Sequence, residues 1–212
     1  MTKPRLYQPK NYDDFKERLK LYCCIFDIEF INIKMKKDVY ENIISESKCF
    51  NMSNDVITNN GRVVEASYLS TTITEVDYEN ICQFYDFDKI KISNMWISRR
   101  DYLPKELLEC VLHFYKGKTE LKDVDGKEKE YLILKGMLNS IFGMMVTDPV
   151  KPLIEFDGNE WQINYENIEE CLNNYNIRYD KFLVYEWGIY CTAYARRNLF
   201  TGVKELKHDY IY

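Results

Sequence analysis

Residues 135–143, with the sequence K-G-M-L-N-S-I-F-G, constrain the fold more than any other segment of this chain. Read as a helix, the segment has two different faces, because residues three and four apart lie together on a helical surface. One face carries a cation, an amide and an aromatic ring: Lys135, Asn139, Phe142 and Gly143. The other face carries an apolar stripe at helical spacing: Leu134, Leu138, Ile141 and Met145. The pattern therefore predicts a helix that packs on one side and offers the other to a ligand with phosphate, sugar and a flat base.

Length and charge suit one domain or a piece of a larger one. The chain has 212 residues, 46% of them hydrophobic, and a net charge of −5. The acidic balance disfavours a free-standing nucleic-acid binder, but basic residues cluster locally, as at Lys116 and Lys118. The 18 tyrosines fit two interpretations, amphipathic packing in a chain of biased composition or stacking on nucleic acid.

The cysteines and histidines predict neither disulfides nor zinc. The seven cysteines are odd in number and contain no C-x-x-C pair, and the chain has two histidines. We interpret the cysteines as packed residues of a protein in a reducing compartment, the cytoplasm. The N-terminal residues form no apolar run typical of a signal peptide, and no segment is long and apolar enough for a membrane span.

Periodicity and turn signals predict an α+β fold. Capping, proline and D-G or N-G signals mark the ends of its elements. Helices are expected at residues 11–22, 76–85, 105–121, 127–145 and 187–206. Strands are expected at residues 24–30, 56–58, 63–73, 90–97, 154–156, 161–163 and 209–212, and the pattern is weak at 38–55. The helix at 105–121 is expected to bury Leu107, Leu108, Val111, Leu112 and Tyr115.

The segment at 135–143 also resembles motif B of family B DNA polymerases, K-x-x-x-N-S-x-[YF]-G, in the form found in protein-primed phage and prophage enzymes. T-A-Y-A-R at 192–196 resembles the T-A-W-A-R segment that precedes motif C in that branch. Residues 208–212 are similar to the strand leading into motif C, and residues 1–5 to the stretch after motif A. The resemblance is strong over residues 102–212 and weak before them.

The resemblance implies roles for particular residues. Lys135 would contact the phosphates of the incoming nucleotide, and Asn139 would shape its pocket. Phe142 stands where this branch usually has tyrosine, so a role needing the hydroxyl is absent, and Gly143 would allow a close approach of template–primer. DNA contacts are implied for Lys116, Thr192 and Arg196. Two alternatives stay open: Lys116 as a lysine at a helix C-terminus, and Arg196 as part of a surface ion pair.

The fold implied is the palm and fingers portion of such a polymerase, with long antiparallel fingers helices and β-hairpins. Residues 1–100 would form the palm edge and an insertion placed like the terminal-protein region of protein-primed enzymes. Residues 101–147 would form the fingers helices with motif B, and residues 148–212 a hairpin insertion and the palm helix leading to the motif C strand.

The implied function is part of a DNA-directed DNA polymerase in phage-type replication, located in the cytoplasm of a bacterial host. The aspartates of motifs A and C, which would hold Mg²⁺ or Mn²⁺, are expected outside this chain, so we expect no catalytic or metal-binding residue within it. Its expected partners are template–primer DNA, dNTP, a terminal protein primer and a complementing polymerase segment. The isolated chain is expected to be inactive. The alternative is a non-catalytic DNA-binding or assembly fragment that complements a chain carrying motifs A and C.

Overall fold

The computed structural model describes residues 4–37, 39, 41–179 and 181–206, and the chain divides into two compact units. The first, here called the sheet unit, comprises Met1–Tyr102 and Tyr190–Tyr212. The second, the hairpin unit, comprises Leu103–Ile189. The strand expected at residues 209–212, and the first residues of the stretch that resembles the sequence after motif A, lie outside the described residues.

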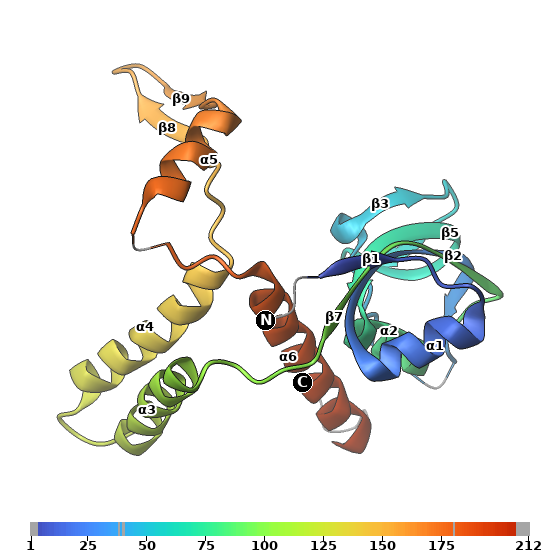
Figure 1. The fold of residues 1–212 in the computed structure, drawn as a ribbon, viewed down its shortest axis with the longest axis horizontal. Helices are drawn as coiled ribbons and strands as arrows, with labels where there is room; N and C mark the ends of the chain where they lie inside the picture. Colours follow the sequence, from blue (N-terminus) through green and yellow to red (C-terminus); the bar gives the residue numbers. More distant parts are fainter. Residues whose placement is uncertain (1–3, 38, 40, 180, 207–212) are drawn as a thin grey trace. The chain divides into compact units, whose positions relative to one another are not determined.

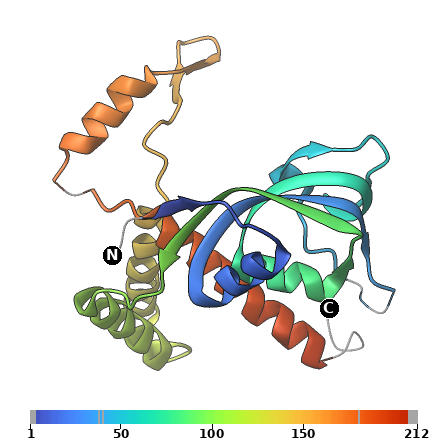
Figure 2. The same cartoon turned by 45° about the vertical axis from the view of Figure 1, so that its right-hand side comes forward.

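An antiparallel sheet dominates the sheet unit, and its long strands are strongly curled (Figures 1 and 2). Within the described residues it has seven strands, in the order β1-β7-β2-β5-β3, with β4 paired to β5 and β6 to β2. The strands are β1 (Arg5–Tyr7), β2 (Tyr22–Met35), β3 (Cys49–Met52), β4 (Ile57–Asn59), β5 (Arg62–Thr74), β6 (Tyr85–Asp86) and β7 (Lys89–Arg99). The strands expected between residues 24 and 97 are confirmed, and the weakly patterned segment supplies β3 and a 3-10 helix, η1 (Glu46–Lys48).

Strand β2 forms the centre of the core because its side chains alternate. Cys24, Phe26, Ile28 and Phe30 are all fully buried, and the residues between them are not. Their partners on β5 and β7 set the register, with Ile28 opposite both Thr71 and Ile92. The predicted alternation is therefore confirmed.

Two helices cover the face of the sheet that carries Phe26. They are α1 (Tyr12–Leu21) and α2 (Glu75–Phe84). The rings of Phe15 in α1 and Tyr78 in α2 both pack against Phe26, at centroid distances of 5.2 and 6.2 Å. Asn11, expected as the first residue of this helix, is its N-cap and accepts from the backbone N–H of Asp14.

Local signals also set the turns of the sheet unit. Thr74 caps α2 by accepting from the backbone N–H of Asp77, which confirms the N-cap of the expected capping box, and the Asp77 carboxylate accepts from the Thr74 hydroxyl. Asn60 and Gly61 join β4 to β5 with φ of 49° and 69°. Positive φ at both central residues is what a tight hairpin turn requires, and asparagine and glycine tolerate it best.

The hairpin unit is built from helices and one small two-stranded sheet (Figure 1). Its elements are α3 (Lys105–Leu121), α4 (Glu128–Met145), β8 (Leu153–Phe156), β9 (Trp161–Asn164), α5 (Ile168–Ile177) and the first residues of α6 (Tyr185–Leu206). Helices α3 and α4 pack together as an antiparallel pair, and Asp123 and Gly126, both at positive φ, turn the chain between them. The expected helices, and the hairpin whose strands meet at Phe156 and Trp161, are confirmed.

Two sequence expectations for the hairpin unit need correction. Leu108, Leu112 and Tyr115, expected to be buried, are 45%, 55% and 54% exposed. Leu107 and Val111, also expected to be buried, are only half-buried, and no described residue of α3 is buried. Within the described residues α3 packs mainly on one helix, α4, so only a narrow stripe of its surface is covered. Helix α5 was not expected, although Asn167 caps it and Glu169 and Glu170 occupy its first turn, which is a recognisable helix start.

Candidate nucleotide and nucleic-acid contacts

Helix α4 has the two faces that its sequence predicts. Lys135, Asn139 and Gly143 are exposed, and Phe142 is half-buried. On the neighbouring face Met145 is buried, and Leu134, Leu138 and Ile141 are half-buried. The ammonium of Lys135 lies 5.8 Å from the centre of the Tyr131 ring, one turn earlier on the helix. The exposed face thus offers a cation, an amide and a glycine to solvent.

A glycine sets how closely α3 approaches α4. A Cβ at Gly117 would lie 2.9 Å from Cδ1 of Leu134, closer than ordinary van der Waals contact. Lys116 and Lys135 are the chain neighbours of these two contacting residues, so the crossing brings both lysines to the same part of the helical pair. The Lys116 side chain is exposed, and its ammonium lies 3.8 Å from the Glu120 carboxylate.

The C-terminal end of α4 is tied to the start of α6. The carbonyl of Met145 accepts from the backbone N–H of Val184 at 3.2 Å, and the Tyr185 hydroxyl donates to the carbonyl of Thr147 at 2.9 Å. A Cβ built at Gly188 would overlap Cγ1 of Val146, so α6 passes close to α4 at this glycine. These contacts hold the last turn of α4, which carries Phe142 and Gly143.

Thr192 and Arg196 lie on α6 within the sheet unit, whereas Lys116 and the candidate nucleotide contacts lie in the hairpin unit. Both side chains are half-buried. The guanidinium of Arg196 pairs with Asp77 in a two-pronged contact, Nε to Oδ1 at 2.8 Å and Nη2 to Oδ2 at 2.9 Å. Arg196 therefore takes part in an ion pair, and the contact joins α6 to the first turn of α2.

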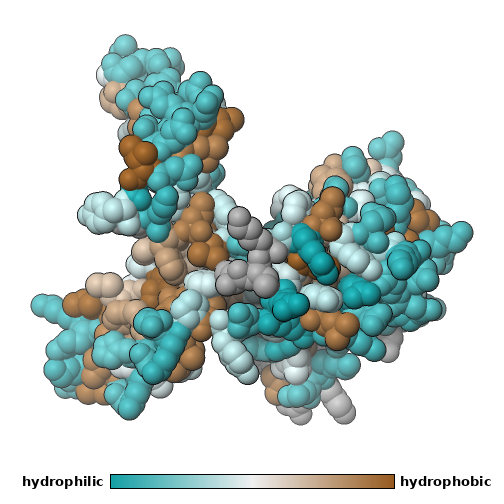
Figure 3. Space-filling model, in the orientation of Figure 1, coloured by the Kyte–Doolittle hydropathy of each residue, from teal (hydrophilic) through white to brown (hydrophobic). Residues whose placement is uncertain are grey.

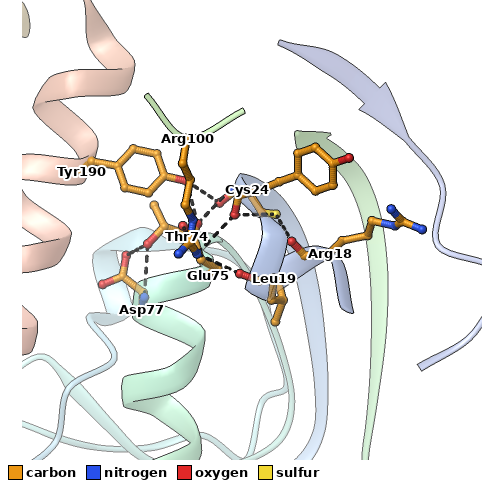
Figure 4. A network of polar contacts seen from close by, with 9 residues as sticks. Arg18, Leu19, Cys24, Thr74, Glu75, Asp77, Arg100 and Tyr190 are labelled. Carbon is orange, nitrogen blue, oxygen red and sulfur yellow. Dashed lines mark hydrogen bonds and ion pairs between the residues drawn. The ribbon is translucent and has the colours of Figure 1, made fainter. Parts of the chain in front are cut away.

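The first turn of α2 also holds a buried carboxylate that sequence reasoning missed (Figure 4). Glu75 is only 1% exposed. Its Oε2 accepts from the backbone N–H of Cys24 at 2.9 Å and from the Tyr190 hydroxyl at 2.6 Å. A terminal nitrogen of Arg100 lies 3.7 Å from Oε1. A glutamate in a first helical turn is typical of exposed helix starts, so no signal in the sequence indicates its burial.

Burial raises the pKa of both groups in the 2.6 Å contact between Glu75 and Tyr190. Desolvation raises the pKa of the Glu75 carboxyl, since burial disfavours the charged form. Desolvation, followed by the nearby carboxylate, raises the pKa of the Tyr190 hydroxyl, which therefore stays a hydrogen-bond donor at neutral pH.

The described residues lack two kinds of feature, a metal-binding cluster and a membrane-spanning helix. They contain no group of three or more histidine, cysteine, aspartate or glutamate side chains arranged to hold a metal ion. None of the described helices is both long enough and apolar enough to cross a membrane. Asp27 and Glu29, which share one strand face, instead contact neighbouring side chains of the sheet, Asn94 and Lys91 among them.

Comparison with known proteins gives a match at the level of structure. No protein-family model matches the sequence, and no curated protein matches it significantly. Phi29 DNA polymerase in an orthorhombic crystal form is similar, with a TM-score of 0.61 and 17% identity, over 96% of this chain and 32% of that one.

The same polymerase complexed with primer-template DNA gives a TM-score of 0.60 at 18% identity, over 94% of this chain and 31% of that one. Its ternary complex with primer-template DNA and incoming nucleotide substrates gives 0.58 at 18% identity, with the same coverage. The present chain thus spans about a third of the polymerase that it matches. Its fold, a curled antiparallel sheet with an added helical pair, is similar to that part of a DNA polymerase.

Proposed function

We propose that this chain is the part of a protein-primed, family B DNA polymerase that contacts the incoming nucleotide and the template. The observation that carries the proposal is the exposed face of α4, where Lys135, Asn139 and Gly143 keep the motif B spacing while the neighbouring stripe of Leu134, Leu138, Ile141 and Met145 is at least half-buried. The likeness of fold to Phi29 DNA polymerase, solved with primer-template DNA and nucleotide substrates, supports it. In this proposal α3 and α4 are the fingers helices, and the sheet unit is the palm edge with its insertion.

The side chains of α4 suit the parts of a nucleotide. The ammonium of Lys135 would neutralise phosphate charge, and the amide of Asn139, one turn on, would shape the sugar pocket. The ring of Phe142 would stack on sugar or base, and Gly143 would let template–primer approach the backbone. Metal chemistry would reside outside this chain, on the aspartates of motifs A and C with their Mg²⁺ or Mn²⁺. The described residues supply no cluster to hold these ions, so we expect the isolated chain to incorporate no nucleotide.

Nucleotide binding tests the role of Lys135. Radiolabelled dNTP is crosslinked by ultraviolet light to the purified 212-residue chain with primer–template present, and labelled peptides are identified by mass. We expect label on α4, reduced about tenfold or more in Lys135→Ala, because a charge-assisted contact to phosphate is lost. Lys129→Ala is the matched control, since Lys129 lies on the same helix but not at a three- or four-residue spacing from Lys135. Label that both variants retain equally would overturn the assignment.

DNA contacts are proposed for Lys116, Thr192 and Arg196, the last two on α6 of the sheet unit. The ion pair of Arg196 uses Nε and Nη2, so a phosphate would be bound through Nη1. Lys116 has an internal control in Lys105, because both are exposed lysines of α3 paired with a glutamate one turn later. We expect Lys116→Ala, but not Lys105→Ala, to lower the slope of log affinity against log salt by about 0.9.

Salt-dependent DNA binding without nucleotide labelling would favour the alternative of a non-catalytic DNA-binding fragment. Equal slopes for the two lysine variants would remove Lys116 from the DNA-binding set.

A second candidate function, an assembly fragment, is favoured by one face of the β8–β9 hairpin. Ile154 pairs with Ile163 and Phe156 with Trp161, so four apolar side chains share that face. They are between 55% and 71% exposed. The opposite face is mostly polar and includes a contact between Asn164 and Glu155. Apolar residues also lie exposed over the part of the chain that contains α3 and α4 (Figure 3). Exposed apolar surface of this kind marks interaction sites.

We propose that a second chain carrying motifs A and C covers this hairpin face. Co-expression of the two chains should yield a complex in which nucleotide incorporation requires both. Trp161→Ala should weaken the complex by about a hundredfold, since central aromatic residues dominate interface energies. Gln162→Ala, on the other face of the same strand, should leave it unchanged. Failure of the two wild-type chains to co-purify would reject this candidate without bearing on nucleotide contacts.

A further inference from the structure

The chain passes between its two units at two places, and a side chain next to each place contacts the same residue of the sheet unit. It leaves the sheet unit after Tyr102 and returns to it at Tyr190. Arg100 lies just before the first passage, and Tyr190 is the first residue after the second. The side chains of both residues reach the carboxylate of Glu75 (Figure 4).

Arg100 and Tyr190, the residues beside the two passages, contact different oxygens of the Glu75 carboxylate. Oε1 faces Arg100, whose terminal nitrogen lies 3.7 Å away, and among the described residues it makes no hydrogen bond. Oε2 accepts from the hydroxyl of Tyr190 at 2.6 Å. The backbone N–H of Cys24 on β2 also donates to Oε2, at 2.9 Å, and so fixes the carboxylate against the sheet.

Each passage is also held by a backbone carbonyl of the sheet unit. Arg100 donates to the carbonyl of Leu19 at 3.0 Å, near the C-terminal end of α1. The hydroxyl of Tyr190 lies 3.1 Å from the carbonyl of Cys24, at the start of β2. The Glu75 carboxylate thus lies in contact with the side chains next to both passages, Arg100 and Tyr190.

Burying the Glu75 carboxylate costs free energy unless hydrogen bonds or an ion pair compensate for the loss of solvation. Glu75 is 1% exposed, and desolvating a charged group is among the largest penalties in a folded protein. The start of α2 does not need it, because Thr74 caps the helix. Packing alone would be satisfied by an apolar residue of similar size. What the carboxylate adds is simultaneous engagement of β2, Arg100 and Tyr190.

We propose that Glu75 is an anchor that holds both connections to the hairpin unit at one point of the sheet unit. The inference rests on the proposed function, in which the hairpin unit carries the nucleotide contacts, and the polypeptide joins the two units at these two connections. Loss of Glu75 loosens both connections at once, whereas loss of Tyr190 or Arg100 contacts loosens one.

Hydrogen exchange of the full chain, followed by mass spectrometry, measures this directly, because local opening sets amide exchange rates. In Glu75→Gln, which keeps the side-chain shape, we expect amides at 97–103 and at 187–193 to exchange about tenfold faster or more, as a charge-assisted contact is lost. Tyr190→Phe should accelerate only the second segment, and Arg100→Gln only the first. Glu79→Gln is the matched control, because it makes the same chemical change one turn later on α2, at an exposed position.

Three results would overturn the anchor. One is faster exchange throughout β2 and β5 in Glu75→Gln, which would mean a general loss of stability. Another is unchanged exchange at either segment in that variant. If Glu75→Gln does not fold, Tyr190→Phe and Arg100→Gln provide the test. The proposal would then be contradicted if Tyr190→Phe accelerated exchange in both segments, or if neither variant accelerated exchange in any segment. None of these readouts depends on polymerase activity.

Discussion

Tyr85 shows how much one buried polar group can matter in this chain. Its side chain is 1% exposed, and its hydroxyl donates to the carbonyl of Val63 at 2.6 Å and accepts from the backbone N–H of Ile43 at 3.2 Å. Burial raises the pKa of this hydroxyl, which therefore remains protonated at neutral pH. The ring fills the core, while the oxygen holds the segment before η1 against β5.

We expect Tyr85→Phe to lower the free energy of unfolding by about 1–3 kcal/mol, because the N–H of Ile43 loses its partner inside the protein. Urea unfolding followed by circular dichroism measures the change. Tyr102→Phe is the matched control, since the Tyr102 side chain is 97% exposed, and it should shift the midpoint little. Equal midpoints for the two variants would show that the Tyr85 hydroxyl is not a stabilising contact.

Among the helices, glycines distinguish free surface from close packing. Gly136 and Gly143 are helical positions of α4 where an added Cβ would meet nothing within 4 Å. Gly188, on α6, is a helical position where the Cβ would overlap Val146. Helix propensity favours alanine over glycine at all three positions, so the environment decides the sign of each substitution.

Gly136→Ala should raise the stability of the hairpin unit by about 0.5–1 kcal/mol, the usual difference between the two residues in a helix interior. Gly188→Ala should lower it by about 1–3 kcal/mol, because the overlap forces α6 away from α4. Thermal unfolding of both variants beside the parent chain tests the pair. A destabilising Gly136→Ala, or a stabilising Gly188→Ala, would mean that the α4–α6 packing differs from that described.

The two units differ in how much apolar surface they bury. Core residues such as Phe26 and Phe30 in the sheet unit are fully buried, whereas in the described part of the hairpin unit the buried hydrophobic residues are Met145 and Cys171. Since burial of apolar surface is the main stabilising term in folding, the hairpin unit is expected to unfold first.

Tryptophan fluorescence separates the two transitions. The chain has three tryptophans, of which Trp96 lies in the sheet unit and Trp161 and Trp187 in the hairpin unit. In Trp96→Phe, the fluorescence should change at a lower guanidinium concentration than the circular dichroism of the sheet. Coincident transitions would show that the whole chain unfolds as one cooperative unit.

Local sequence signals were sufficient for most elements of this fold. The alternation in β2, the caps of α1 and α2, and the turn at Asn60 and Gly61 each depend on neighbouring residues, so a linear pattern predicts them. The two faces of α4 follow in the same way, because helical spacing determines which side chains lie together.

The amino-acid sequence by itself therefore determined the α+β class, the helix with Lys135, Asn139, Phe142 and Gly143, and the resemblance carried by that helix. Only the tertiary structure decided which stripe of α3 packs, because that depends on its having α4 as its main partner helix. It also decided that Glu75 is buried between Arg100 and Tyr190, and that Arg196 pairs with Asp77. Contacts between residues so far apart along the chain produce no periodic pattern in the sequence, because they depend on how helices and strands pack together and not on the local sequence of each element.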